Sequence, residues 1–306
     1  MSIVKRQHYV WRQYLRSWSS KERICTLLKE KNEVRTTGLM GVAQERYFYR
    51  LQELSISEFE LLEGLISKSH HSVQGLLNDF LIPYRAFTDI SKKIKGSKPN
   101  EKIESELREI EINTLEKIHG KFETDGAKLI SCRSQEDLKQ ILSNPDDRNS
   151  ALIFLCVQYY RTNKVKNDVI NSFKDDGKMD ISKIWNIVTL IMSFNTARNI
   201  AIDEKLRFRY FENQTNIPFV TGDQPVLNIK QNEKDEYGNV KDLEFFYPLS
   251  PLNAISVHFE NSQTEQIEKI LISQPMVEYF NDFVIENSLK FSFCNNEEYL
   301  NKKKRT

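Results

Sequence analysis

The sequence predicts an α+β protein in which a large helical body is joined to a smaller, mostly antiparallel sheet formed by the C-terminal third. Three observations favour this fold class. Apolar residues recur at helical spacing through most of residues 55–205. From Leu206 onward, short runs of β-branched and aromatic residues alternate with Gly, Asn, Asp and Pro, which is typical of antiparallel strands. The chain also holds only 10 Gly and 8 Pro in 306 residues, which favours a helix-rich protein.

We expect a single domain spanning residues 1–306, because a chain of this length can bury one large core. Within it, residues 1–54 would form an N-terminal helix and hairpin. Residues 55–205 would form the helical body, and residues 206–306 a β-rich part with a C-terminal helix. The sequence shows no internal repeat.

The N-terminal part begins with a short helix expected over residues 8–18. Ile24–Leu28 then reads as a strand, and the polar residues KEKN lead into a second strand that contains Val34. These two strands predict a small β-hairpin, which could join the C-terminal sheet.

The helical body follows from apolar spacing and from capping residues. Ser55 and Ser57 can cap a first helix. A proline inside an apolar helical run should kink or end it, and a polar run should form a connecting loop. The segments expected are an apolar helix over Gly75–Phe87 broken at Pro83, a flexible connector over Lys92–Lys102, an amphipathic helix over Glu101–His119, a turn and cap over Ser143–Ser150, and apolar helices over Ala151–Thr162 and Ile181–Ile202.

The C-terminal third begins with the strand-like pieces RFRYFEN, PFVTGDQPVLNI, LEFFYPLSP and NAISVHFE. Lys230–Asp242 is a polar hairpin loop between two of these strands. We expect a helix over Thr264–Asn287, a strand over Lys290–Cys294 and a disordered tail, KKKRT.

Composition excludes several classes of protein. The net charge is +1, so no global field attracts nucleic acid or an anionic membrane, and any site for a polyanion must be local. The four cysteines are far apart and lack metal-ligand spacing, which predicts reduced thiols and no zinc site. The sequence has no nucleotide-binding loop, and we expect no cofactor. The N-terminus lacks an apolar signal sequence and no run of about 18 apolar residues occurs, so we expect a cytoplasmic protein with no membrane contact.

The segment Arg6–Trp18 combines one histidine with three arginines and four large aromatic residues. Like-charge repulsion from Arg6, Arg12 and Arg16 should lower the pKa of His8 and keep its imidazole neutral and able to accept a proton at pH 7. Arg12 and Arg16 are four residues apart, so both lie on one helical face, as in a phosphate clamp or a solvated stripe.

Several landmarks resemble, in order, a widespread and mostly bacterial family known as domain of unknown function 4238. They are Gln7-His8-Tyr9-Val10, Tyr14-Leu15-Arg16-Ser17-Trp18, Phe48-Tyr49, Ile103-Glu104, Gln158-Tyr159-Tyr160-Arg161-Thr162, Phe219-Val220-Thr221-Gly222-Asp223-Gln224-Pro225, Pro248-Leu249-Ser250-Pro251, and a helix that contains Asn281. The resemblance extends from about residue 5 to residue 295.

The resemblance implies a shared fold and a shared site rather than a defined activity. Trp11 replaces a usual proline, and Gly222 replaces a usual serine and so removes a hydroxyl that could have been a nucleophile. Members often occur among defence or toxin genes, which implies a nuclease, for example an effector of antiviral defence or a toxin.

We place four polar groups together, because each lies in a motif with many apolar neighbours: His8, Gln158, Arg161 and Asp223. Such a set suits phosphodiester chemistry. His8 would be the general base or acid, Arg12 and Arg161 would stabilise charge on a phosphate, and Gln158 and Asp223 would orient them. RNA is favoured over DNA if no metal takes part, because the 2′-hydroxyl supplies the nucleophile.

Substrate binding is assigned to Arg12, Gln158, Tyr9 and Arg16. Tyr9 and the other aromatic residues of the opening segment could stack on bases, although at helical spacing they are more often part of the core. A partner protein or a second copy of the chain could also bind.

Other readings of the same residues stay open. Arg161 and Asp223 could form a purely structural pair, in which the arginine lowers the pKa of the aspartate, with Gln158 binding backbone groups. The protein would then be a non-catalytic binding or sensor protein. A metal site at Asp223 lacks a Glu-x-Lys element on the next strand, and His70-His71 lie on adjacent positions that diverge on a helix, so we expect no metal.

Overall fold

The computed structural model describes residues 3–96, 100–172, 180–238, 240–261 and 265–304. Its mixed helical and strand content confirms the α+β fold class. The α-helices are α1 (Arg12–Leu15), α2 (Ile56–Ser67), α3 (His71–Asp79), α4 (Ile82–Lys95), α5 (Glu101–Asp125), α6 (Ala127–Ile130), α7 (Gln135–Ser143), α8 (Pro145–Tyr160), α9 (Asn163–Ser172), α10 (Ile181–Ile202), α11 (Gln274–Asn287) and α12 (Glu297–Lys302).

The strands form three sheets. They are β1 (Arg6–His8), β2 (Ser19–Ser20), β3 (Arg23–Leu28), β4 (Glu33–Gly38), β5 (Gln44–Arg46), β6 (Leu206–Asn213), β7 (Thr221–Gly222), β8 (Leu227–Asn228), β9 (Phe245–Ser250), β10 (Asn253–Phe259), β11 (Ile267–Ile272) and β12 (Phe291–Cys294). Two short 3-10 turns, η1 (Arg16–Trp18) and η2 (Leu39–Gly41), lie near the N-terminus.

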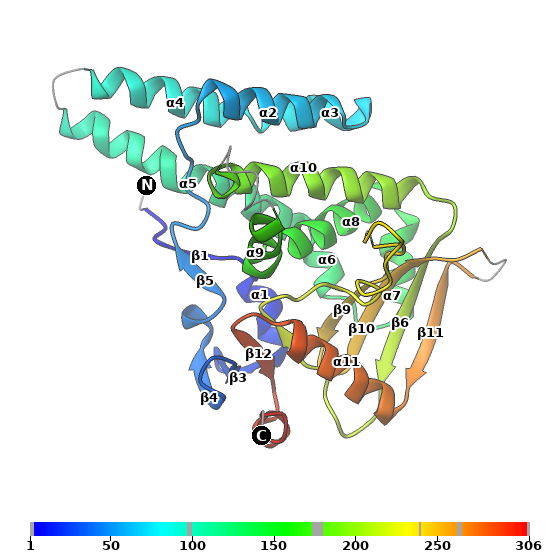
Figure 1. The fold of residues 1–306 in the computed structure, drawn as a ribbon. Helices are drawn as coiled ribbons and strands as arrows, with labels where there is room; N and C mark the ends of the chain where they lie inside the picture. The colour runs from blue at the N-terminus through cyan, green and yellow to red at the C-terminus, as the bar shows by residue number, and fades with distance from the viewer. Residues whose placement is uncertain (1–2, 97–99, 173–179, 239, 262–264, 305–306) are drawn as a thin grey trace.

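The largest sheet comes from the C-terminal third, as predicted, in the order β11-β6-β10-β9-β8. Its pairs are antiparallel except for β11 with β6. In Figure 1 this sheet lies on the right, below α10 and α8, with α11 beside it.

The predicted N-terminal hairpin exists as β3 and β4, but it belongs to a second sheet. There β3 pairs with β12, so that Cys25 lies opposite Cys294, and β12 also pairs with β7. The two ends of the chain are therefore hydrogen-bonded to one another. A third pairing joins β1 to β5 in a two-stranded ribbon on the left of Figure 1.

Helix boundaries follow the predicted caps in part, since α8 begins at Pro145, inside the stretch predicted as a turn. The Ser55 hydroxyl accepts from the Glu58 amide in a capping box at the start of α2. The α10 bounds match the predicted Ile181–Ile202. Pro83 does not end a helix. It occupies the first turn of α4, where the missing amide hydrogen of proline leaves no hydrogen bond unmade. The interruption between α3 and α4 lies before it, after Asp79.

Two predictions for the C-terminal third were wrong in part. The expected helix over Thr264–Asn287 begins only after β11, because the β-branched residues of Ile267–Ile272 complete the edge of the large sheet beside β6. The tail is also more ordered than predicted: Lys302 ends α12, and Lys303 Nζ lies 2.6 Å from Glu278 Oε2. Residues 305–306 of the tail, and residues 97–99 of the expected connector, lie outside the described residues.

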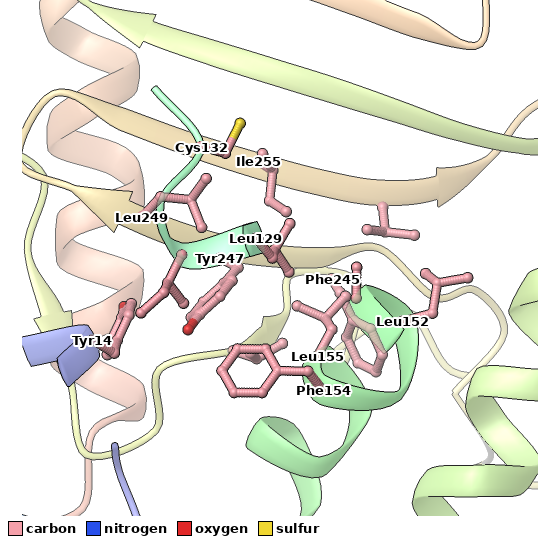
Figure 2. Close-up of a cluster of buried hydrophobic side chains, with 14 of the residues drawn as sticks. Tyr14, Leu129, Cys132, Leu152, Phe154, Leu155, Phe245, Tyr247, Leu249 and Ile255 are labelled. Carbon is pink, nitrogen blue, oxygen red and sulfur yellow. The ribbon is translucent and has the colours of Figure 1, made fainter. Parts of the chain in front are cut away.

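The hydrophobic core joins the helices to the large sheet. In Figure 2, Leu152 and Leu155 of α8 lie beside Phe245 of β9. At the other end of the same cluster the ring of Tyr14 stacks on Tyr247, with 5.0 Å between ring centroids. The opening segment is thus part of the core. The organisation of the whole chain as a single domain stays a prediction. Among the described helices, none combines the length with the apolar character that a membrane span requires.

Candidate active site

Helix α8 positions two of the predicted site residues, Gln158 and Arg161. Asn144 caps the helix, since its side-chain oxygen accepts from the amides of Asp146 and Asp147 at 3.0 and 3.1 Å. Gln158 lies in the last turn and Arg161 is the C-cap. The two residues are three positions apart, so they lie on one face of the helix.

The partner of this face is α5, which packs directly against α8. A close approach is possible because residue 126, just after α5, is glycine: a Cβ on Gly126 would overlap the ring of Phe154 on α8. The side chains of α5 that act on Arg161 are Glu116, His119 and Glu123. Their spacing of three and four residues places them on the same side of α5.

Arg161 is a buried cation, with 1% of its surface exposed. Its Nη2 lies 2.9 Å from Glu123 Oε1. Burial raises the pKa of Glu123, and the adjacent guanidinium opposes that rise. Burial and the nearby Glu123 carboxylate raise the pKa of Glu116 to about 7, again opposed by Arg161. The pKa of His119 falls well below its usual value, through burial and then through repulsion by Arg161.

Many buried polar atoms around Arg161 make no hydrogen bond to any residue that the structure describes. They are the Nε and Nη1 of Arg161, both amide atoms of Gln158, Glu116 Oε2, His119 Nδ1 and the Tyr247 hydroxyl. Buried polar groups in native proteins are almost always hydrogen-bonded, so a concentration of unpaired ones requires an explanation such as bound water, an ion or a ligand. We call these five residues, together with Glu123, the Arg161 cluster.

His8 lies at the end of β1, partly buried, with Nε2 3.3 Å from the carbonyl oxygen of Leu39. The predicted lowering of the His8 pKa is confirmed, but its main cause is burial. Repulsion by Arg12 and Arg161 adds to it, and the contact with Leu39 opposes it. Because a carbonyl oxygen only accepts, Nε2 must carry the proton, and the neutral ring therefore presents Nδ1 as its basic nitrogen.

Asp223 is buried like Arg161 but is bound differently. Its Oδ1 accepts from the Leu289 amide at 2.7 Å, and its Oδ2 accepts from the amides of Lys290 and Phe291 at 2.7 and 3.3 Å. It thereby fixes the turn between α11 and β12. Burial raises the pKa of Asp223 to about 6, against the pull of these amides.

The structure therefore corrects the expected pairing of Arg161 with Asp223, and with it the expected lowering of the Asp223 pKa. The two motifs do meet, but one residue further along each of them. The Thr162 hydroxyl donates to Gln224 Oε1, and Gln224 Nε2 donates to the carbonyl oxygens of Tyr159 and Val226 at 3.1 and 2.8 Å. Arg161 instead turns toward α5.

The remaining predicted residues differ in how far their side chains are exposed to solvent. Tyr9 is buried, 1% exposed, and packs on Phe48 with 5.4 Å between ring centroids, so in this structure its ring is a core group and not a stacking surface. Arg12 is partly exposed, with Nη1 2.7 Å from Met40 Sδ. Arg16 points outward and its Nε lies 2.6 Å from Glu22 Oε1.

Of the predicted set, Arg12 and Arg161 each lie within electrostatic range of His8, and Tyr9 lies within range of Asp223. Sequence reasoning missed Glu116, His119 and Glu123. The available signal was the recurrence of polar residues on the face of α5 that also carries the buried Ile112 and Leu115. Among the described residues, no group of three His, Cys, Asp or Glu side chains could hold a metal ion.

Comparison with known proteins adds a family but no activity. No curated protein and no solved structure matches the chain. A family model described as "Protein of unknown function (DUF4238)" matches residues 6–298, nearly the whole chain. The match covers both β1 with His8 and the α5 and α8 helices that form the Arg161 cluster. The chain therefore belongs to the DUF4238 family.

Proposed function

We propose that the protein cleaves RNA without a metal ion, with His8 as the general base. The observation that carries this proposal is the state of the His8 ring. Its Nε2 is held at the Leu39 carbonyl, its pKa is lowered, and two arginines lie within electrostatic range, so that a neutral imidazole with a basic Nδ1 stands beside fixed positive charge.

In this mechanism Nδ1 of His8 takes the proton of the 2′-hydroxyl. The 2′-oxygen then bonds to phosphorus as the bond to the 5′-oxygen breaks, giving a 2′,3′-cyclic phosphate and a 5′-hydroxyl that receives a proton from water. Arg12, which is partly exposed, is the cation that can contact the phosphate. Arg161 is buried and acts on His8 through its charge. Asp223 holds the turn between α11 and β12 and does not contact these groups directly.

A second candidate is a non-catalytic binding or sensor protein, which the contacts of Asp223 favour. Three backbone amides bound by one buried carboxylate are a structural clamp. In either case the frequent occurrence of DUF4238 members among defence or toxin genes supports an effector role in the cytoplasm, alone or with a protein partner.

The test is incubation of the purified protein with total RNA in EDTA, beside His8→Ala and the control His71→Ala, which removes an exposed histidine on α3. We expect cleavage by the wild type and the control, and at least a hundredfold slower cleavage by His8→Ala, which is the low end for loss of a general base. Equal cleavage by all three proteins, or cleavage by none, refutes the proposal. If His8→Ala also lowers the melting temperature by several degrees, the structural role is supported instead.

A further inference from the structure

A polar pocket of about 500 Å³ lies along β5, next to the strand that carries His8. Its charged lining consists of four cations and two acids: Arg46, Arg50, Lys166, Lys183, Glu45 and Asp180. The rings of Tyr47 and Phe48 also line it. We call it the β5 pocket.

Both acids of the β5 pocket are engaged by other groups. Glu45 Oε1 accepts from Asn163 Nδ2 at 2.8 Å and lies 3.4 Å from Lys290 Nζ. Asp180 caps α10, with its Oδ1 accepting from the Ser182 amide at 3.0 Å. Of the four cations, Lys183 forms an ion pair with Glu58, which does not line the pocket, with 2.9 Å between Lys183 Nζ and Glu58 Oε2.

The other three cations of the pocket are Arg46, Arg50 and Lys166. Within the described ranges of the chain, Arg46, Arg50 and Lys166 form no ion pair. Lys166 is partly buried, and its Nζ lies 5.8 Å from the centre of the Phe48 ring. Burial lowers the pKa of Lys166, while Glu45 and Asp180 oppose that effect. A desolvated ammonium without a hydrogen-bonded carboxylate gains free energy from any anion that reaches it.

The backbone next to the pocket is also unusual. Arg6 and Arg46 lie directly opposite one another in the β1–β5 ribbon, and like charges in such a pair destabilise it. Ala43 and Tyr47, on either side of β5, have φ angles of +47° and +59°. Such strained residues persist where the surrounding structure holds them, and they often mark ligand sites. Here they flank the strand in which Arg46 lies opposite Arg6.

We propose that the β5 pocket binds phosphate groups of single-stranded RNA. Unpaired cations supply the affinity for phosphate, and the partly buried aromatic residues Tyr47 and Phe48 beside them fit the combination of charge and aromatic rings that single-strand binders use. The choice of RNA as the polymer depends on the proposed function. Gln44 is the partner of His8 and precedes Arg46 by two residues, about 7 Å along a strand, so one RNA strand can span both sites.

The experiment measures binding of a fluorescein-labelled 12-nucleotide RNA by fluorescence anisotropy in EDTA, at several salt concentrations. All proteins carry His8→Ala so that the RNA stays intact. The test variant adds Arg50→Gln and Lys166→Gln. The control adds Lys31→Gln and Lys139→Gln, which remove two exposed lysines from a hairpin turn and from α7. Melting temperatures show whether each variant folds.

We expect the test variant to bind at least tenfold more weakly than the control, with a slope of log K against log salt that is smaller by about 1.4, as for two lost phosphate contacts on a single strand. Equal affinity and slope in test and control variants, or no RNA binding by any protein, would overturn the inference. Equal affinity for a 12-base-pair duplex would overturn the assignment to single strands.

These outcomes are separable from those of the proposed function. If the wild type cleaves no RNA, while the test variant binds RNA more weakly than the control variant, the β5 pocket is supported and the nuclease is refuted. If cleavage depends on His8 while the test variant binds RNA like the control, the nuclease is supported and the pocket is refuted.

Discussion

Two buried polar regions of this protein differ in how completely their hydrogen bonds are made. Around Asp223, each carboxylate oxygen has an amide partner. Nearby, Asn281 accepts from the Val220 amide at 2.8 Å and donates to the Pro218 carbonyl oxygen at 2.8 Å. The Arg161 cluster, by contrast, leaves hydrogen-bonding atoms of five side chains unpaired among the described residues.

This difference suggests that the region around Asp223 maintains the fold, whereas the Arg161 cluster has the capacity to bind a ligand. A satisfied network fixes one arrangement of the chain and has no capacity left for a ligand. An unsatisfied one costs stability in the free protein, and water, an ion or a substrate group can recover that cost. Both regions lie within the part of the chain that matches the DUF4238 family, so membership of the family does not tell them apart.

The largest expected effect tests the ion pair at the centre of the Arg161 cluster. Arg161→Met leaves Glu123 buried without its cation, and we expect a loss of about 3 to 5 kcal/mol in the free energy of unfolding. Urea unfolding of the double variant Arg161→Met, Glu123→Gln should recover most of this loss, because both charges are then gone. A single variant as stable as the wild type would show that the pair is open to solvent.

The second prediction concerns the satisfied region. Asp223→Asn places an amide donor among backbone donors, so we expect a loss of about 2 to 3 kcal/mol at pH 7.5, measured by urea unfolding. Asp79→Asn, on the exposed end of α3, is the control and should change stability by no more than about 0.5 kcal/mol. Similar small changes in both variants would mean that the Asp223 clamp contributes little.

The third prediction uses the pKa of about 7 that burial gives Glu116. Its value in the unfolded chain is about 4.3, so the folded protein holds a proton that the unfolded chain releases. Stability should therefore fall as the pH rises from about 4 to about 7, and stay level above that. Glu116→Gln lacks this carboxyl, so it should match the wild type near pH 4 and exceed it by about 1 to 3 kcal/mol at pH 8.

The control for Glu116 is Glu106→Gln, an exposed position on the same helix. Its stability should follow the wild type at both pH values in the same urea titrations. A Glu116→Gln variant that is less stable than the wild type at pH 8 would show that the ionised carboxylate is needed, as it would be for a bound cation.

The smallest effect tests packing in the satisfied region. A Cβ at residue 222 would fall on Ser288 Oγ, which donates to the Val284 carbonyl oxygen at 2.8 Å. Gly222→Ala should therefore cost about 1 kcal/mol, as the serine rotates out of that hydrogen bond. In a Ser288→Ala background the same substitution should cost less, and thermal melting of the four proteins measures the difference. Equal costs in both backgrounds would contradict the proposed overlap.

Local signals predicted much of the fold. The capping serine of α2 and the apolar spacing of α10 predicted those helices correctly, because each depends on residues within a few positions of one another. The start of α8 was predicted six residues too late, because the polar residues after Pro145 resemble a turn although they form its first turns. The error at β11 arose because its residues suit either a strand or a helix, and only the open edge of β6 decides between them.

The candidate site shows the same division. The lowered pKa of His8 was predictable in direction, but its main cause, burial, was not visible in the sequence. Arg161 was predictable as a residue whose charge needs a partner. That the partner is Glu123, with Glu116 and His119 beside it, depends on the packing of α5 against α8.

By itself, the sequence determined the fold class, most helices, the family, and the residues whose charges cannot remain unpaired. Only the tertiary structure decided which charges meet: Arg161 with Glu123, and Asp223 with three backbone amides. It also leaves three cations of the β5 pocket without an ion pair among the described residues. The reason is physical. Helix propensity and capping act over a few residues, whereas the pairing of charges depends on which distant segments the hydrophobic core brings within a few ångströms.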